Sequence, residues 1–239
     1  MAGMSVIPIV ALDFASASAA VALVDRLGER CRFYKVGSEL FTAAGPDVVT
    51  RIRDRGVSVF LDLKLHDIPN TVAGAVRAGA ALGARLITVH ASGGSTMMAA
   101  AVAAAGDQTQ CGILGVTVLT SLTGVEVATA WGRSPAQLDP MVEVVRLAGL
   151  VAESGAHGIV CSGREASAVR TAFGSRLAML IPGVRPAGEG AHDQARVVTP
   201  GEAVAAGASY IVIGRSVTAA EDPVIAMDRI NVEITVATR

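Results

Sequence analysis

Lysine is nearly absent from this chain, since only Lys35 and Lys64 among its 20 Lys and Arg residues are lysines. Arginine keeps its proton to above pH ~12, whereas lysine titrates near pH ~10.4 and its pKa shifts readily in a protein. Lys64 stands in a dense run of charge, residues 62–67, at the end of an apolar stretch. Two lysines left by chance on a solvated surface are the alternative, but neither lies in a surface-like segment. The scarcity predicts that Lys64 does what arginine cannot, which is to hand a proton to a substrate.

Other absences exclude whole classes of protein. The three cysteines have neither a CxxC nor a metal-binding spacing, which predicts reduced, buried thiols in a cytoplasmic protein. The net charge is -1, with no basic stripe or acidic tail, so we expect no nucleic-acid partner. No apolar run reaches the ~18 residues of a membrane helix, and the first residues lack the positive charge of a signal peptide. A membrane partner is therefore not expected.

Short apolar runs alternate with helical patterns along the whole chain. Eight runs, rich in β-branched and bulky apolar residues, predict buried parallel strands at 7–12, 32–36, 57–63, 86–90, 112–119, 158–161, 178–181 and 210–213. Residues 17–28 and 141–154 place apolar side chains on one helical face, and glycines 28, 56, 83, 155 and 174 fall where helices should end. The pattern predicts an α/β fold, a single (β/α)8 TIM barrel domain over residues 1–239.

Two features of this organisation leave alternatives. An open doubly wound sheet is the second architecture, but no GxGxxG follows the first predicted strand. Residues 121–135 form an unusually long connection with two glycines, a tryptophan and a proline. A loop of this length is either a functional lid or a plain insertion.

Polar residues follow nearly every predicted strand, at the end where barrel enzymes have their active sites. The residues at these strand ends are Asp13, Lys35, Asp62, Lys64, His90, Thr120, Ser162, Gly183, Arg185, Gly214 and Arg215. Those after the seventh and eighth strands lie where barrels often bind phosphate. Glycine lets the backbone approach an anion and arginine pairs with phosphate in a fork, so Arg185, Gly214 and Arg215 predict a phosphate site. Solvated loop arginines are the alternative.

Asp62 and Lys64 are two residues apart on one strand and therefore project from the same face. Lys35 ends the previous strand and lies beside them if the second and third strands pair, which predicts alternating carboxylates and ammonium groups. Asp67 comes after the strand end. It reaches this cluster only if its loop folds back, or it enters the pocket of a neighbouring molecule, and the spacing leaves both open. A purely structural ion-pair network is a further alternative.

The segment Asp62-Leu-Lys64-Leu-His-Asp67-Ile-Pro-Asn-Thr71 resembles the signature of the orotidine 5'-phosphate decarboxylases, and the length and spacing resemble the bacterial branch. Further similar motifs are Ala11-Leu12-Asp13, Lys35-Val36-Gly37, Val118-Leu119-Thr120-Ser121, Pro182-Gly183-Val184-Arg185, Asp193-Gln194 and Gly214-Arg215. The resemblance implies decarboxylation of orotidine 5'-monophosphate to UMP and carbon dioxide in de novo pyrimidine biosynthesis, with no cofactor and no metal.

The resemblance also implies a role for each matching residue. Lys64 donates a proton to C6 of the pyrimidine, and Asp62 lies against the substrate carboxylate. Asp13 and Lys35 contact the ribose, with Lys35 also in the charged array. Asp67 and Thr71 come from the partner subunit of a homodimer with shared sites. The remaining substrate contacts are Thr120 to the pyrimidine ring, and Arg185, Gln194, Gly214 and Arg215 to the phosphate.

Three rival functions remain. Magnesium-dependent sugar-phosphate lyases of the same superfamily share the Asp-x-Lys-x-x-Asp pattern, and the resemblance implies a metal-binding carboxylate in them where this chain has Lys35. A Schiff-base aldolase would use Lys64 as a nucleophile, which requires the neutral amine and is disfavoured by flanking carboxylates. A non-catalytic binder of phosphoribosyl ligands would have no need of Lys64.

Overall fold

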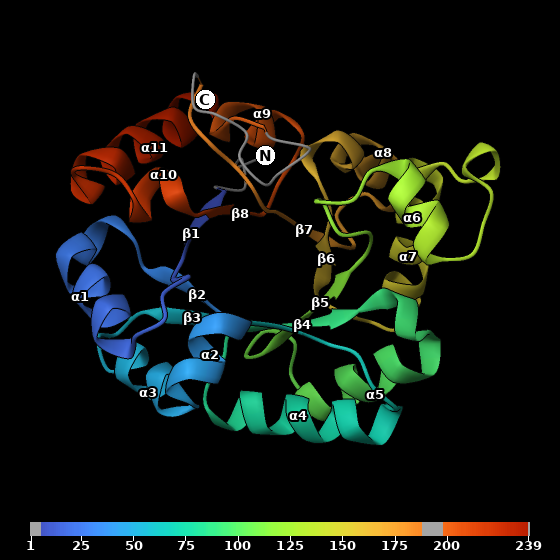
Figure 1. The fold of residues 1–239 in the computed structure, drawn as a ribbon, viewed down its shortest axis with the longest axis horizontal. Helices are drawn as coiled ribbons and strands as arrows, with labels where there is room; N and C mark the ends of the chain where they lie inside the picture. Colours follow the sequence, from blue (N-terminus) through green and yellow to red (C-terminus); the bar gives the residue numbers. More distant parts are fainter. Residues whose placement is uncertain (1–5, 188–197, 239) are drawn as a thin grey trace.

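Eight parallel strands close into a barrel in the computed structural model, which describes residues 6–187 and 198–238. The strands follow one another round the barrel in chain order, and β1 closes it by pairing with β8. Helices surround this ring on the outside (Figure 1). The predicted (β/α)8 TIM barrel is thereby confirmed. The strands are β1 Ile7–Ala11, β2 Phe33–Gly37, β3 Ser58–Leu65, β4 Leu86–His90, β5 Gly112–Val116, β6 Gly158–Val160, β7 Ala178–Ile181 and β8 Tyr210–Ile213.

The helices begin and end largely where residue type dictates. Asp139 caps α7 by accepting the Met141 N–H, and Pro140 occupies the first position, where a missing N–H costs nothing. Gly28 and Gly174 end α1 and α8 at positive φ, 50° and 61°. The α-helices are α1 Ala17–Leu27, α2 Ser38–Ala44, α3 Asp47–Arg53, α4 Pro69–Ala81, α5 Ser95–Ala105, α6 Gly124–Ala130, α7 Pro140–Glu153, α8 Gly163–Phe173, α9 Pro200–Ala205, α10 Arg215–Thr218 and α11 Pro223–Ala237.

Two apolar clusters account for the buried core. One fills the barrel with inward-facing strand residues such as Phe60, Leu114 and Leu180. The other lies between the outer face of the strands and the helices, where the alternate strand residues pack. Because both faces are covered, the strands read as nearly continuous apolar runs in the sequence. The described part of the chain has no helix long and apolar enough to cross a membrane, and all three cysteines are buried free thiols.

Two predicted segments differ from the structure. The fifth strand ends at Val116 rather than residue 119, because β6 is only three residues long and its last residue, Val160, pairs with Val116. The connection at residues 121–135 is not a plain loop, since it contains α6. Thr123 and Glu126 cap that helix reciprocally, and Arg133 pairs with the buried Glu143 of α7, which ties the segment to the barrel.

Candidate active site

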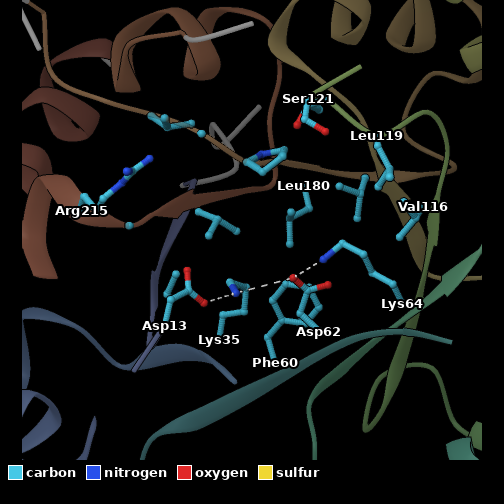
Figure 2. Close-up of a pocket in the computed structure, with 18 of the residues that line it drawn as sticks. Asp13, Lys35, Phe60, Asp62, Lys64, Val116, Leu119, Ser121, Leu180 and Arg215 are labelled. Atoms are coloured by element: carbon cyan, nitrogen blue, oxygen red, sulfur yellow. Dashed lines mark hydrogen bonds and ion pairs between the residues drawn. The ribbon is translucent and has the colours of Figure 1, made fainter. Parts of the chain in front are cut away.

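A cavity of about 490 Å³ opens at the carboxyl ends of the strands. Apolar side chains from the barrel interior form part of its lining, and charged side chains from the strand ends form the rest (Figure 2). The lining residues that the sequence predicted are Asp13, Lys35, Asp62, Lys64, Thr120, Gly183, Arg185, Gly214 and Arg215. The cavity therefore collects most of the predicted strand-end residues from six different strands or the loops after them.

Four of these side chains form a row of alternating charge. The Lys35 Nζ lies 2.8 Å from Asp13 Oδ1 and 3.7 Å from Asp62 Oδ2, and the Lys64 Nζ lies 2.8 Å from the same Asp62 oxygen (Figure 2). The row follows from strand pairing, because Gly37 of β2 lies opposite Asp62 of β3. The predicted proximity of Lys35 to Asp62 and Lys64 is confirmed. The second carboxylate of the row is Asp13.

The centre of the row is buried and its ends are open. The side chains of Lys35 and Asp62 are each 11% exposed, whereas those of Lys64 and Asp13 are 40% and 55% exposed. Burial by itself would raise the pKa of the Asp62 carboxyl. The ammonium groups of Lys64 and Lys35, with hydrogen bonds from Lys64 and Thr88, outweigh burial and lower that pKa below its ordinary value. Asp62 is thus a carboxylate at neutral pH, fixed between two cations.

Lys64 has an unusual backbone. Its φ is 49°, which makes it the one non-glycine residue at positive φ among residues 6–187 and 198–238. The left-handed region costs a non-glycine residue about 1–2 kcal/mol. The left-handed conformation of Lys64 coincides with an irregularity in the pairing of β3 and β4, where the register shifts between Leu61 and Leu65. Strain of this kind persists where the surrounding structure imposes it, and here it turns a lysine toward the cavity.

The sequence prediction missed Thr88, the side chain that contacts this strained segment. Thr88 lies inside β4 and is completely buried. Its hydroxyl donates to Asp62 Oδ1 and accepts the Lys64 N–H, both at 2.9 Å. The available signal was alternation, because Thr88 is a polar residue in an apolar strand, two positions before His90 and on the same face.

The cavity has apolar walls beneath the charged row. Phe60, Val116, Val160, Leu180 and Val212 line it, and all five belong to the cluster that fills the barrel. Water is largely excluded on that side, which strengthens electrostatic interactions in the row.

The predicted phosphate-site residues follow β7 and β8, across the barrel from β3, which carries Asp62 and Lys64. Arg215 and Lys64 are at opposite sides of the drawn cavity lining (Figure 2). Arg215 begins α10 directly after β8, and Arg185 follows β7 with a side chain that is nearly buried. A β-carbon added to Gly214 would meet no atom within 4 Å, so the backbone there is open to a ligand. Gln194 lies outside the described residues.

Asp67 and Thr71 do not line the cavity. The Asp67 carboxylate instead accepts the N–H of Ile68 at 2.6 Å, and Ile68 is 67% exposed at the surface. The loop between β3 and α4 therefore does not fold back onto its own site, which contradicts one of the two alternatives for Asp67. The other alternative, entry into a neighbouring molecule, remains a prediction.

Two further strand-end residues that were expected at the site have other surroundings. Ser162 is buried and caps α8 together with Glu165. His90 lies against His66, with ring centroids 5.3 Å apart. Burial lowers the pKa of His90, and the nearby His66 and Lys64 lower it further, so its imidazole is neutral at physiological pH.

The described residues contain no group of three or more His, Cys, Asp or Glu side chains arranged to hold a metal ion. The two oxygens of the buried Asp62 carboxylate already face Lys35, Lys64 and Thr88. The donor set of the cavity thus consists mainly of cations and hydroxyl groups, which suits an anionic ligand.

Comparison with known proteins gives a consistent family match. The family model described as Orotidine 5'-phosphate decarboxylase / HUMPS matches residues 7–230. The orotidine 5'-phosphate decarboxylase of Halorhodospira halophila is 50% identical over 230 residues, which cover 96% of each protein. That of Alkalilimnicola ehrlichii is 48% identical over 228 residues and 95% of each. The crystal structure of orotidine 5'-phosphate decarboxylase from Lactobacillus acidophilus superposes with a TM-score of 0.83 at 35% identity, covering 95% of this chain and 98% of that one.

Proposed function

The chain belongs to the Orotidine 5'-phosphate decarboxylase / HUMPS family, and on that premise we propose that it converts orotidine 5'-monophosphate to UMP and carbon dioxide. It is a carboxy-lyase of pyrimidine biosynthesis. The observation that supports this activity is the ion-pair row Asp13–Lys35–Asp62–Lys64. In this row Lys64 lies at the exposed end and pairs with the buried Asp62 carboxylate.

The ion-pair row supplies a positive charge and a proton close to the reacting carbon. When the bond between C6 and the carboxylate breaks, carbon dioxide leaves and the electron pair stays on C6, where the pyrimidine offers no conventional electron sink. An ammonium group close to C6 stabilises that charge as it develops and then transfers a proton to it. Lys64 is the proton donor in this proposal, and solvent later returns the proton to its neutral amine. No cofactor takes part in these steps.

Asp62 acts on the other side of the reacting bond. A second carboxylate beside that of the substrate repels it, and the repulsion disappears when neutral carbon dioxide forms. Asp62 remains ionised because Lys35 and Lys64 hold its pKa low against the opposing effect of burial. The apolar walls formed by Phe60 and its neighbours favour an uncharged product over a carboxylate.

The opposite end of the cavity is suited to the phosphate. Arg185, Arg215, Gly214 and, outside the described residues, Gln194 are the proposed phosphate ligands. Because this group is remote from the bond that breaks, its binding energy is available for positioning the substrate rather than for the chemical step itself. Thr120 is proposed to contact the pyrimidine ring, and Asp13 and Lys35 the ribose hydroxyls.

We further propose a homodimer that completes each site across its interface. Asp67 and Thr71 are exposed, they lie outside their own cavity, and the neighbouring Ile68 is a large apolar side chain left 67% exposed. The three buried free thiols suit a cytoplasmic enzyme.

The rival functions meet specific obstacles in this cavity. A magnesium ion beside Asp62 would be repelled by the Lys35 ammonium, which lies 3.7 Å from that carboxylate. A Schiff-base mechanism needs a Lys64 amine that is free to attack a carbonyl, but this nitrogen lies 2.8 Å from Asp62 in an ion pair. A non-catalytic binding protein would not require the strained left-handed backbone that Lys64 has.

The decisive experiment is a turnover assay with orotidine 5'-monophosphate, followed by its ultraviolet absorbance, with and without EDTA. We expect rapid loss of the substrate and no effect of the chelator. Absence of turnover by folded protein would refute the proposed function, and activity abolished by EDTA would favour the magnesium-dependent lyase. Borohydride trapping of a substrate adduct would favour the aldolase.

A further inference from the structure

One buried hydroxyl, that of Thr88, contacts both Asp62 and Lys64 of the charged row. From its contacts we propose that Thr88 is a positioning residue, which holds the Lys64 backbone and the Asp62 carboxylate in the geometry that proton transfer requires. The inference rests on the proposed function, and it adds a buried residue of β4 that supports the site without lining the cavity.

Thr88 uses both capacities of its hydroxyl. The O–H donates to Asp62 Oδ1 and the oxygen accepts the Lys64 N–H, each at 2.9 Å. A hydroxyl offers one proton and two lone pairs, so one small group serves both partners at once. Because Thr88 has 0% exposure, water does not compete for either bond.

The ladder irregularity explains why the backbone of Lys64 needs this partner. Leu61 pairs with Ile87 and Leu65 pairs with Val89. Between these pairs β3 has three residues, 62–64, whereas β4 has only Thr88. The three residues cannot all pair with the backbone of β4. The side chain of Thr88 therefore accepts the N–H of Lys64, in place of a backbone carbonyl. An unsatisfied N–H at this depth would disfavour the left-handed conformation of Lys64.

The same hydroxyl orients the Asp62 carboxylate. Oδ1 accepts from Thr88, while Oδ2 faces the ammonium groups of Lys64 at 2.8 Å and Lys35 at 3.7 Å. With Oδ1 held, the carboxylate cannot rotate and exchange its oxygens, so Oδ2 stays between the two cations. Loss of the hydroxyl therefore frees the backbone of the proton donor and the rotation of its carboxylate partner together.

Thr88→Val tests this role, because valine keeps the shape of threonine and removes only the hydroxyl. Small displacements of reacting groups cost up to ~100-fold in rate, so we expect kcat to fall by about 10- to 100-fold. The KM and the dissociation constant of UMP should change by less than about threefold, since Thr88 does not line the cavity and the phosphate grip is remote. Thr88→Ser, which restores the hydroxyl, should return kcat to within about threefold of wild type.

Thr117→Val is the matched control. Thr117 is also a buried threonine, 3% exposed, at the end of a barrel strand, and its hydroxyl donates to the Val160 carbonyl at 2.8 Å. It has no hydrogen bond to the charged row among those described. Loss of the Thr117 hydroxyl should lower the thermal midpoint, as we also expect for loss of the Thr88 hydroxyl, but it should leave kcat near the wild-type value. If Thr88→Val does not fold, Thr88→Cys against Thr88→Ser gives the same comparison, because a thiol is only a weak donor and acceptor whereas a hydroxyl is a strong one.

A second measurement does not depend on turnover. The chain has only two lysines, so labelling with ¹³Cε-lysine yields two side-chain NMR signals, which Lys64→Ala assigns. We expect Thr88→Val to shift or broaden the Lys64 signal more than the Lys35 signal, and Thr117→Val to leave both in place. This test stands even if the wild type fails to decarboxylate orotidine 5'-monophosphate, a failure that would refute the proposed function alone.

Several results would overturn the inference. They are a Thr88→Val enzyme with wild-type kcat, a Lys64 signal that Thr88→Val leaves unchanged, an equal loss of kcat in Thr117→Val, and a Thr88→Ser enzyme as impaired as the valine variant. The last two would mean that packing or general stability, and not the hydroxyl, accounts for the effect.

Discussion

Gly37→Ala is a substitution that should damage the site while sparing the fold. Gly37 ends β2, is buried, and pairs with Asp62 across the sheet. A β-carbon added there would lie 2.9 Å from the Lys35 Nζ and 3.3 Å from Asp13 Oδ1. The backbone itself accepts alanine, because its φ is -89°. The conflict is therefore with the charged row alone.

The structure also sets the size of the effect. Ordinary contact begins near 3.4 Å, so the Lys35 ammonium has to retreat by about 0.5 Å. Lengthening its pairs with Asp13 (2.8 Å) and Asp62 (3.7 Å) by that amount weakens the attraction by about 1.4 kcal/mol at an effective dielectric constant near 20. About 1.4 kcal/mol corresponds to about a tenfold loss of kcat/KM. The weaker ion pairs also lower the free energy of unfolding, but alanine restricts the unfolded chain and offsets about 0.4–1 kcal/mol of that loss, so the thermal midpoint should change little.

The assay is decarboxylation of orotidine 5'-monophosphate together with thermal unfolding of the same preparations. Gly149→Ala in α7 is the control, since its β-carbon would meet only Phe173 at 3.9 Å. We expect this control to keep both activity and stability. Wild-type kcat/KM in a folded Gly37→Ala enzyme would refute the argument that the position of Lys35 matters to the reaction.

The remaining predictions concern proton transfer, shared sites and pH. Lys64→Arg should lower kcat by at least about 100-fold and leave UMP binding within about threefold, because arginine supplies charge without a transferable proton; rapid turnover would contradict this. Mixing inactive Lys64→Ala and Asp67→Ala subunits should restore about a quarter of wild-type activity, since half of the dimers are mixed and each holds one complete site; zero activity in demonstrably mixed dimers would count against sharing. Burial lowers the pKa of His90, aided by His66 and Lys64, and also that of His157. The unfolded chain thus binds more protons below pH ~6.5, and the free energy of unfolding should decrease as pH falls from there. In urea titrations from pH 5 to 7.5, His90→Gln should flatten that decrease, and an unchanged slope would disprove its contribution.

Local sequence patterns were sufficient for the barrel and for most of the site. Strands buried on both faces must be continuously apolar, so their positions are visible without knowledge of their neighbours. Parallel strands bring their carboxyl ends to one edge, so polar residues at strand ends converge there. This reasoning placed Lys35, Asp62 and Lys64 together, and in the structure the Asp62 carboxylate lies 3.7 Å from the Lys35 Nζ and 2.8 Å from the Lys64 Nζ.

Errors arose where one-dimensional patterns do not carry the information. The strand-end argument also placed His90 and Ser162 at the site. In the structure His90 lies against His66, and Ser162 caps α8. The connection at residues 121–135 contained a helix, α6, whose capping pair Thr123 and Glu126 was present in the sequence but was overlooked.

The sequence by itself determined the architecture, the family and the scarcity that singled out Lys64, because each depends on residue type and spacing along the chain. Only the tertiary structure decided how Lys64 is held. Its left-handed backbone, the hydroxyl of Thr88 and the close approach of Gly37 to Lys35 all depend on the register between neighbouring strands. Register is set by packing over the whole barrel, and a shift of one residue would move every one of these contacts.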